Sequence, residues 1–201
     1  MARLLVFCLM LVLISSKAYT QKEVVAKQLP EICISRTELD LYNLINEYRA
    51  QKGLPSVKLS ASLSFVARTH AVDQTENFKD GGRCNMHSWS GKGAWSPCCY
   101  TPDHKKAKCM WSKPRELTNY QADGFEISFY STYPYSTPEA FVKDILDGWK
   151  KSPGHNEVII NKKIWKDMKW QAIGIGIYGE YADVWFGAVK DDAGEPRPCD
   201  E

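Results

Sequence analysis

The sequence lacks a surplus of charge of either sign, and after residue 14 it lacks any long run of apolar residues. Its 26 basic and 24 acidic side chains give a formal charge of +2. A chain this close to neutrality is not expected to bind nucleic acid by general electrostatic attraction, and short basic runs such as Lys162-Lys163 are typical of solvated surface. Without a long apolar segment, the body of the chain is not expected to span a membrane.

The apolar run near the start, Leu4–Ile14, is too short to cross a bilayer. Arg3 precedes it, and Ser16-Lys17-Ala18 follows with small residues at the positions that a signal peptidase reads. This order predicts a secretory signal peptide over residues 1–18, with cleavage after Ala18 or near Thr20. The protein is therefore expected to be secreted and extracellular. Loss of the two basic residues in the signal peptide would bring the formal charge to zero.

Familiar catalytic motifs are absent as well. The chain has no His-Glu-x-x-His, no Gly-x-Ser-x-Gly and no glycine-rich phosphate loop. It also has no Asn-x-Ser/Thr site for N-glycosylation. Any site chemistry must therefore come from histidines and carboxylates that the fold brings together from distant positions.

The cysteines predict a cross-linked protein. Of the seven, six remain once Cys8 leaves with the signal peptide, and an even number in a secreted chain predicts three disulfides. These six are Cys33, Cys84, Cys98, Cys99, Cys109 and Cys199. We expect two local bridges within residues 84–109 and one between the ends, with the pairing open. Cys84-x-x-His87 also has zinc-ligand spacing, but an oxidising compartment favours disulfides over that alternative.

Helical and strand patterns alternate along the chain. Helices are predicted from the capping box at residues 35–38 to Gly53, after Ser60, and after Thr137, where Pro138 is the first helical residue. A strand is predicted at residues 124–130 and a hairpin at residues 172–178 and 181–189, whereas residues 79–114 are expected to be irregular. Gly174 and Gly176 leave one hairpin face bare, which indicates close packing against it. The pattern predicts an α+β fold with helices on both sides of an antiparallel sheet.

A histidine follows the third helix directly. Pro153 is expected to end that helix, Gly154 to adopt a left-handed backbone, and His155 to be held at the resulting corner. Two other histidines have ordinary interpretations: His70 as a helix-face residue with a satisfied partner, and His104 as solvated surface.

Several motifs together resemble one family. They are Asn85-Met86-His87-Ser88, Gly124-Phe125-Glu126-Ile127, Ser152-Pro153-Gly154-His155-Asn156, the helix at residues 41–49, the helix at residues 59–73 and the Gly-Ile-Gly-Ile hairpin. In this order they resemble the CAP superfamily of cysteine-rich secretory, antigen 5 and pathogenesis-related proteins, with a Ser-Pro-Gly-His corner of the bacterial type. The resemblance covers residues 35–189.

The resemblance implies a three-layer α-β-α sandwich with a central antiparallel sheet. It implies a CAP domain at residues 35–190, after a lead-in at 19–34 and before a tail at 191–201. It also implies a cleft lined by His87, Glu126 and His155, where His87 and His155 can hold Zn²⁺. Two imidazoles and a carboxylate are suitable zinc ligands, although a buried hydrogen-bonded cluster that only shapes the cleft is the alternative.

One expected cleft group is missing. The family's second acidic residue usually follows the helix tryptophan, but here Lys150-Lys151-Ser152 follows Trp149. Asp147 or Glu157 could replace it, although neither matches the motif. Acid–base catalysis by paired carboxylates is therefore less expected than binding.

The predicted function is an extracellular binding, defence or signalling module with a zinc-competent cleft, and more a binding protein than an enzyme. Dense aromatic residues around the irregular segment favour a core, but they also fit a surface for apolar ligands. Because some members of the family bind sterols or fatty acids, a sterol- or fatty-acid-binding protein is one alternative, and a metal-assisted hydrolase is another. The expected partner is a small apolar ligand or an extracellular protein.

Overall fold

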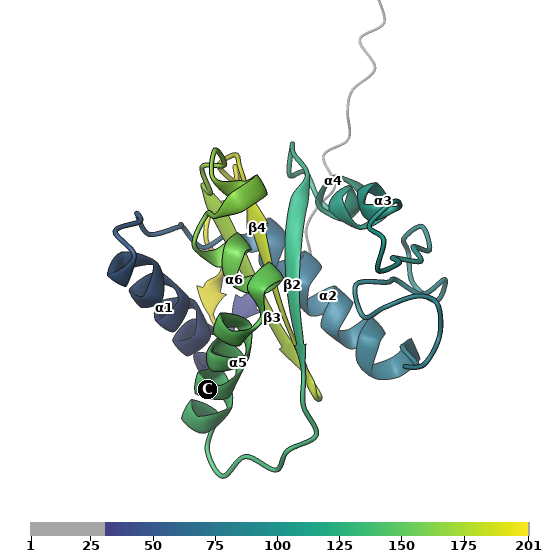
Figure 1. The fold of residues 1–201 in the computed structure, drawn as a ribbon, viewed down its shortest axis with the longest axis horizontal. Coiled ribbons are helices and arrows are strands. Elements are labelled where there is room, and N and C mark those ends of the chain that lie inside the picture. Colours follow the sequence, from purple (N-terminus) through teal and green to yellow (C-terminus); the bar gives the residue numbers. More distant parts are fainter. Residues whose placement is uncertain (1–30, 201) are drawn as a thin grey trace, which may run out of the picture.

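The computed structural model describes residues 31–200 (Figure 1). The predicted signal peptide, its cleavage site and most of the lead-in lie outside the described residues. The central sheet has the strand order β2-β4-β3 and is antiparallel throughout. Its strands are β2 (Gly124–Tyr130), β3 (Ala172–Tyr178) and β4 (Tyr181–Gly187). The strand and the hairpin predicted from the sequence are confirmed, although β4 is slightly shorter than expected.

Helices cover both faces of this sheet, as Figure 1 shows. One layer contains α1 (Arg36–Gln51), α5 (Pro138–Lys151) and α6 (Pro153–Ile159). The other contains α2 (Ala61–Asn77), α3 (Ala107–Trp111) and α4 (Lys113–Leu117). The predicted α-β-α sandwich is therefore confirmed, and the helix at residues 163–165 is a single 3₁₀ turn.

Local sequence signals explain where the long helices begin. The Ser35 hydroxyl accepts from the Glu38 N–H while the Glu38 carboxylate accepts from the Ser35 N–H, which completes the predicted capping box. Ser60 and Thr137 cap α2 and α5 through their hydroxyls alone, which accept from the N–H groups of Leu63 and Ala140. Gly53 follows α1 with a φ of 73°, a conformation that glycine adopts without strain.

The bare face of the hairpin lies directly against α2. A Cβ atom on Gly174 would lie 2.1 Å from the backbone of Leu63, and one on Gly176 would lie 2.1 Å from the backbone nitrogen of Arg68. Real side chains do not tolerate such separations, so only glycine allows this approach. The close packing predicted from the two glycines is confirmed.

The opposite face of the sheet packs against α1, α5 and α6. Leu41, Ile45, Ile127, Ile145 and Ile175 are fully buried there and belong to one hydrophobic core. This burial supplies most of the free energy that holds the layer in place, at about 25 cal/mol for each Å² of apolar surface removed from water.

Three disulfides join Cys33 to Cys199, Cys84 to Cys99, and Cys98 to Cys109. The prediction of two local bridges and one between the ends is confirmed. Because these cysteines are oxidised, the zinc alternative built on Cys84 and His87 is wrong. Near the first bridge, β1 (Cys33–Ile34) pairs in parallel with β5 (Arg197–Pro198).

Two sequence predictions need correction. Residues 107–117, expected to be partly irregular, form α3 and α4, which the apolar side chains of Ala107 and Met110 anchor to the core. The corner after α5 is also different. Pro153 ends α5 but begins α6, because its fixed φ and missing N–H suit the first turn of a helix. Gly154 has no positive φ, and His155 lies in the first turn of α6.

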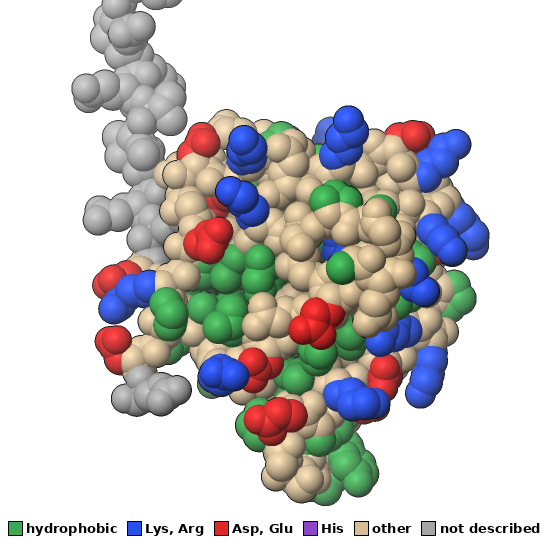
Figure 2. Space-filling view, turned by 90° about the vertical axis from the view of Figure 1, so that its left-hand side faces the viewer, with side chains coloured by type: hydrophobic (Ala, Val, Ile, Leu, Met, Phe, Trp, Pro, Cys, Tyr) green, Lys and Arg blue, Asp and Glu red, His purple; other side chains and the backbone are tan. Residues whose placement is uncertain are grey.

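The surface on the α1 side mixes charges of both signs around an apolar patch (Figure 2). Among residues 31–200, no helix combines the length and the apolar character needed to cross a membrane.

Candidate functional site

His87, Glu126 and His155 line one cavity of about 410 Å³, although they come from three different parts of the fold. His87 lies in the cross-linked segment, Glu126 in β2 and His155 in α6. Most of the other wall residues are apolar or aromatic. They include Tyr100, Met110, Trp111, Phe125, Val158 and Trp165. The cavity therefore has a polar floor and a largely apolar wall.

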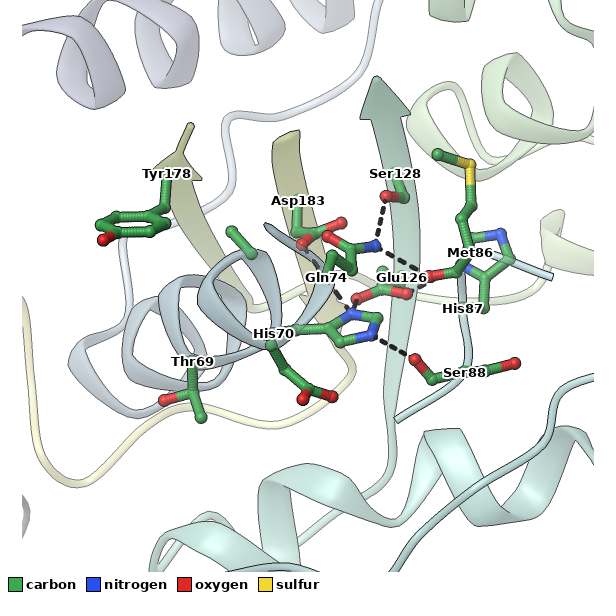
Figure 3. A network of polar contacts seen from close by, with 12 residues as sticks. Thr69, His70, Gln74, Met86, His87, Ser88, Glu126, Ser128, Tyr178 and Asp183 are labelled. Carbon is green, nitrogen blue, oxygen red and sulfur yellow. Dashed lines mark hydrogen bonds and ion pairs between the residues drawn. The ribbon is translucent and has the colours of Figure 1, made fainter. Parts of the chain in front are cut away.

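Glu126 lies between two imidazole rings at the back of the cavity (Figure 3). Its Oε2 atom is 2.7 Å from Nδ1 of His87, and its Oε1 atom is 2.5 Å from Nδ1 of His70. Burial raises the pKa of this carboxyl, but the charge and hydrogen bond of His70, together with His87, outweigh burial and lower the pKa to about 2. Glu126 is therefore an ionised carboxylate that accepts from both rings.

The two cleft histidines face each other across the floor. The ring centroids of His87 and His155 are 6.2 Å apart, and the rings are nearly perpendicular. Because Nδ1 of His87 is engaged by Glu126, its Nε2 atom is left for other contacts. Burial, with the charge of His87, lowers the pKa of His155 to about 4, so His155 is a neutral imidazole at physiological pH.

Residues of α1 hold the helix that carries His155. The Tyr48 hydroxyl donates to the Asn156 side chain at 3.0 Å. Arg49 is almost fully buried and donates to the carbonyl of Ile159 at 2.5 Å and to the side chain of Asn161 at 2.8 Å. These contacts satisfy groups at the C-terminal end of α6, so the position of His155 depends on α1.

His70 is a helix residue with satisfied partners, as expected, but one of those partners is the cleft carboxylate Glu126. It is fully buried on α2, stacks on Trp89 with centroids 4.3 Å apart, and has Nε2 3.0 Å from the carbonyl of Ser88. Burial opposes its charged form, but the charge and hydrogen bond of Glu126 raise the pKa of His70 to about 9. The apolar stripe on this helix predicted that His70 is buried, but it did not predict that His70 faces the Glu126 carboxylate.

Asp183 was missed altogether by sequence reasoning. It lies on β4 opposite Ser128 of β2, is fully buried, and has Oδ2 3.8 Å from Nδ1 of His70. Burial and the nearby charge of Glu126 raise the pKa of Asp183 well above its ordinary value. Together, His70, Glu126 and Asp183 could hold a metal ion. The available signal was a carboxylate inside the otherwise apolar run Tyr181–Gly187.

The proposed substitutes for the missing carboxylate lie in different places. Glu157 lines the cavity and pairs with Lys163 at 2.6 Å. Asp147 pairs instead with Lys143 near the surface and does not line the cavity. His104 is exposed, as expected, although it also borders the cavity, where its Nδ1 atom is 2.8 Å from the Tyr100 hydroxyl.

Comparison with known proteins gives one family match. The model of CAP, the cysteine-rich secretory protein family, matches residues 42–103. No curated protein matches the chain by sequence. An outer surface protein from Borrelia burgdorferi has a similar fold, with a TM-score of 0.50 and 21% identity, over 77% of this chain and 96% of that chain.

Two further solved structures have TM-scores of 0.48. A cysteine-rich secretory protein from Staphylococcus aureus is 17% identical over 76% of this chain, and an extracellular protein with an SCP domain from Bacillus anthracis is 16% identical over 75%. The present chain spans only 38% and 39% of their lengths. The CAP resemblance predicted from the motifs is confirmed, by the family match and by the α-β-α sandwich described above.

Proposed function

We propose that this protein is a secreted, extracellular binding protein of the CAP type whose cleft binds Zn²⁺ through His87 and His155. The observation that carries the proposal is the hydrogen bond between Nδ1 of His87 and Glu126. Zinc-bound histidines commonly donate their second ring nitrogen to a carboxylate, which fixes the tautomer and leaves the other nitrogen for the metal. Neutral His155 supplies a second lone pair beside it.

Glu126 has a different role from that expected from the sequence. Both of its oxygens already accept hydrogen bonds from imidazole rings, so it orients His87 rather than acting as a third ligand. The donor set of two imidazoles fits zinc, with coordination positions left for water or a ligand. Bound zinc would supply a Lewis acid at the floor of the cavity.

Binding is a better proposal than catalysis because neither cavity carboxylate is free to act as a general acid. The low pKa of Glu126 keeps it ionised, and Glu157 is paired with Lys163. Acid–base chemistry needs a group that can both hold and release a proton near neutral pH. A metal-assisted hydrolase therefore remains the weaker alternative.

An apolar ligand is favoured by the cavity wall. Trp111 and Trp165 both contact Phe125, with ring centroids 5.2 and 5.0 Å away. Ligand pockets typically combine such aromatic walls with a few polar groups. Binding of a sterol or fatty acid at this wall is thus the second candidate function, and zinc binding does not exclude it.

Zinc titration of the oxidised protein tests the first proposal. We expect about one equivalent bound in the cleft, and a loss of affinity of at least about 100-fold in His87→Ala and in His155→Ala. His104→Asn is the matched control, because His104 also lines the cavity and Asn tolerates its left-handed backbone. No zinc uptake by the wild type, or full uptake by both alanine variants, would contradict the proposal.

Two further assays separate the alternatives. If the aromatic wall binds the ligand, Phe125→Ala should lower the affinity for a fluorescent sterol or fatty acid, measured by exchange. The zinc affinity of this variant should stay nearly unchanged. A peptide and ester panel tests hydrolysis. Activity that persists in both His87→Ala and His155→Ala would not come from this cleft.

A further inference from the structure

A cluster of unpartnered acceptors lies behind the cleft, between α2 and the sheet. Within residues 31–200, the side-chain oxygen of Gln74 and both carboxylate oxygens of Asp183 are buried without a hydrogen-bond partner. Both residues are at most 1% exposed. Figure 3 shows them turned toward Glu126 and His70. Buried acceptors without a partner are rare in folded proteins, so three in one place indicate a missing donor, water or cation.

The geometry of His70 is that of a metal ligand. A carbonyl can only accept, so the contact between Nε2 and the carbonyl of Ser88 places a hydrogen on Nε2. In the metal-free protein Nδ1 donates to Glu126, and an ion that displaces this Nδ1 proton would find a lone pair facing Glu126. Ligand atoms of His70, Glu126 and Asp183 all lie within 4.8 Å of one another. A backbone carbonyl on the second nitrogen is the usual outer contact of a metal-bound histidine.

A divalent ion competes with a proton for this cluster. A proton on Asp183 can be donated to the Gln74 oxygen, and the Ser128 hydroxyl, which accepts from Gln74, can donate to the other carboxylate oxygen. A divalent ion can contact several oxygens at once, and two carboxylates with a neutral imidazole balance its charge.

We propose that His70, Glu126 and Asp183 form a second, internal cation site, with the Gln74 oxygen as a further ligand. One nitrogen and several oxygens suit Mn²⁺ or Zn²⁺. Ligand distances of about 2.1 Å require the His70 and Glu126 atoms, now 2.5 Å apart, to separate to about 3 Å. The site shares only Glu126 with the cleft. Because its three residues are buried, the ion is expected to enter during folding and to exchange slowly.

The test uses His155→Ala, which lacks a cleft ligand but retains the internal site. The disulfide-intact protein is unfolded in denaturant, refolded with Mn²⁺ or Zn²⁺, treated briefly with chelator to remove surface ions, and assayed for metal content. We expect about one ion per chain, released only when the chelator is added together with denaturant. Fewer than about 0.1 ion per chain would overturn the proposal and leave a proton or water as the occupant.

A second variant locates the ion. Adding Asp183→Asn to His155→Ala should abolish the retained ion, whereas adding Asp147→Asn, which changes a carboxylate near the surface, should not. Full retention by the Asp183→Asn protein would also overturn the proposal. If Asp183→Asn does not fold, the measurement on His155→Ala still decides. The cleft proposal fails separately, when His155→Ala binds as many ions as the wild type.

Discussion

At the scale of single residues, Glu126 organises the candidate site. It accepts from His87 on the cleft side and from His70 on the buried side, so a single carboxylate sets the orientation of two imidazole rings. This role requires an ionised carboxylate with two acceptor oxygens. A glutamine amide at this position would offer one oxygen and one NH₂ group, so it could not accept from both rings.

Glu126→Gln should therefore weaken zinc binding in the cleft by about 10- to 100-fold, since it disturbs the tautomer of His87. Zinc titration measures the effect. Glu157→Gln serves as the control because Glu157 lines the same cavity but pairs with Lys163. Equal losses in the two variants would show that only the charge of the cavity matters.

The raised pKa of His70 predicts a pH dependence of stability in chelator. The folded-state pKa of about 9 lies above the ordinary value of 6.5, so the folded protein binds the proton more tightly than the unfolded chain. This stabilisation is complete below pH 6.5 and is lost as the pH rises through 9. Denaturant unfolding from pH 6 to 10 should show the decline in the wild type and not in His70→Asn. Parallel curves would contradict the prediction.

Motifs were sufficient to find His87, Glu126 and His155, because each lies in a recognisable short segment. They were not sufficient for Asp183. Its neighbours on the relevant face, His70 and Gln74, belong to α2, more than 100 residues earlier in the chain. The register of β2 against β4, which sets Ser128 opposite Asp183, and the packing of α2 on the sheet bring these groups together, and no local pattern contains either.

At the scale of elements, α6 is held as much by α1 as by its own sequence. Arg49 is the principal contact because its guanidinium serves the carbonyls of Pro55 and Ile159 and the side chain of Asn161. The helix contains only seven residues, too few to be stable alone.

Arg49→Met should lower the free energy of unfolding by about 2–4 kcal/mol, because buried acceptors lose their donors. It should also weaken zinc binding, because His155 is no longer held in position. Arg36→Met on the same helix is the control. Arg36 is exposed and pairs only with Asp40, so its replacement should cost less than about 1 kcal/mol. Chemical denaturation and zinc titration of both variants decide the matter.

Caps and hairpins were predictable because their signals are local, as at Ser35 and Gly179. The corner at Pro153 was not, because proline has two compatible roles there. It cannot continue α5, yet it suits the first turn of a new helix. Packing against α1 favours the second role, and Arg49 and Tyr48 lie too far away in the sequence to indicate it.

At the scale of the whole molecule, the disulfides divide into two kinds. The Cys33–Cys199 bridge closes a segment of 166 residues outside the cavity. The other two constrain the segment that carries His87. The resemblance to CAP proteins predicted the three layers of the sandwich. It did not predict how Cys84, Cys98, Cys99 and Cys109 pair, because that depends on how the backbone of residues 84–109 folds.

Replacement of Cys33 and Cys199 by serine should lower the free energy of unfolding by about 3–5 kcal/mol through the added entropy of the unfolded chain. Zinc affinity should stay nearly constant, because neither cysteine lines the cavity. Replacement of Cys84 and Cys99 by serine should instead reduce both quantities, since His87 follows Cys84 by three residues. Calorimetry with zinc titration measures both effects, and an unchanged zinc affinity in the second variant would contradict this division.

The glycines of β3 have a wider consequence. Because Gly174 and Gly176 lock α2 onto the sheet, the backbone positions of His70, Glu126 and Asp183 are set by these packed elements. The segment at residues 78–106 contributes His87 and Tyr100 to the cavity, and it is held by its own disulfides and by hydrogen bonds that link Met86, Ser88 and Ser90 to α2. Evolution or protein engineering can therefore change what the cleft recognises by altering this segment, as long as those contacts with α2 are kept.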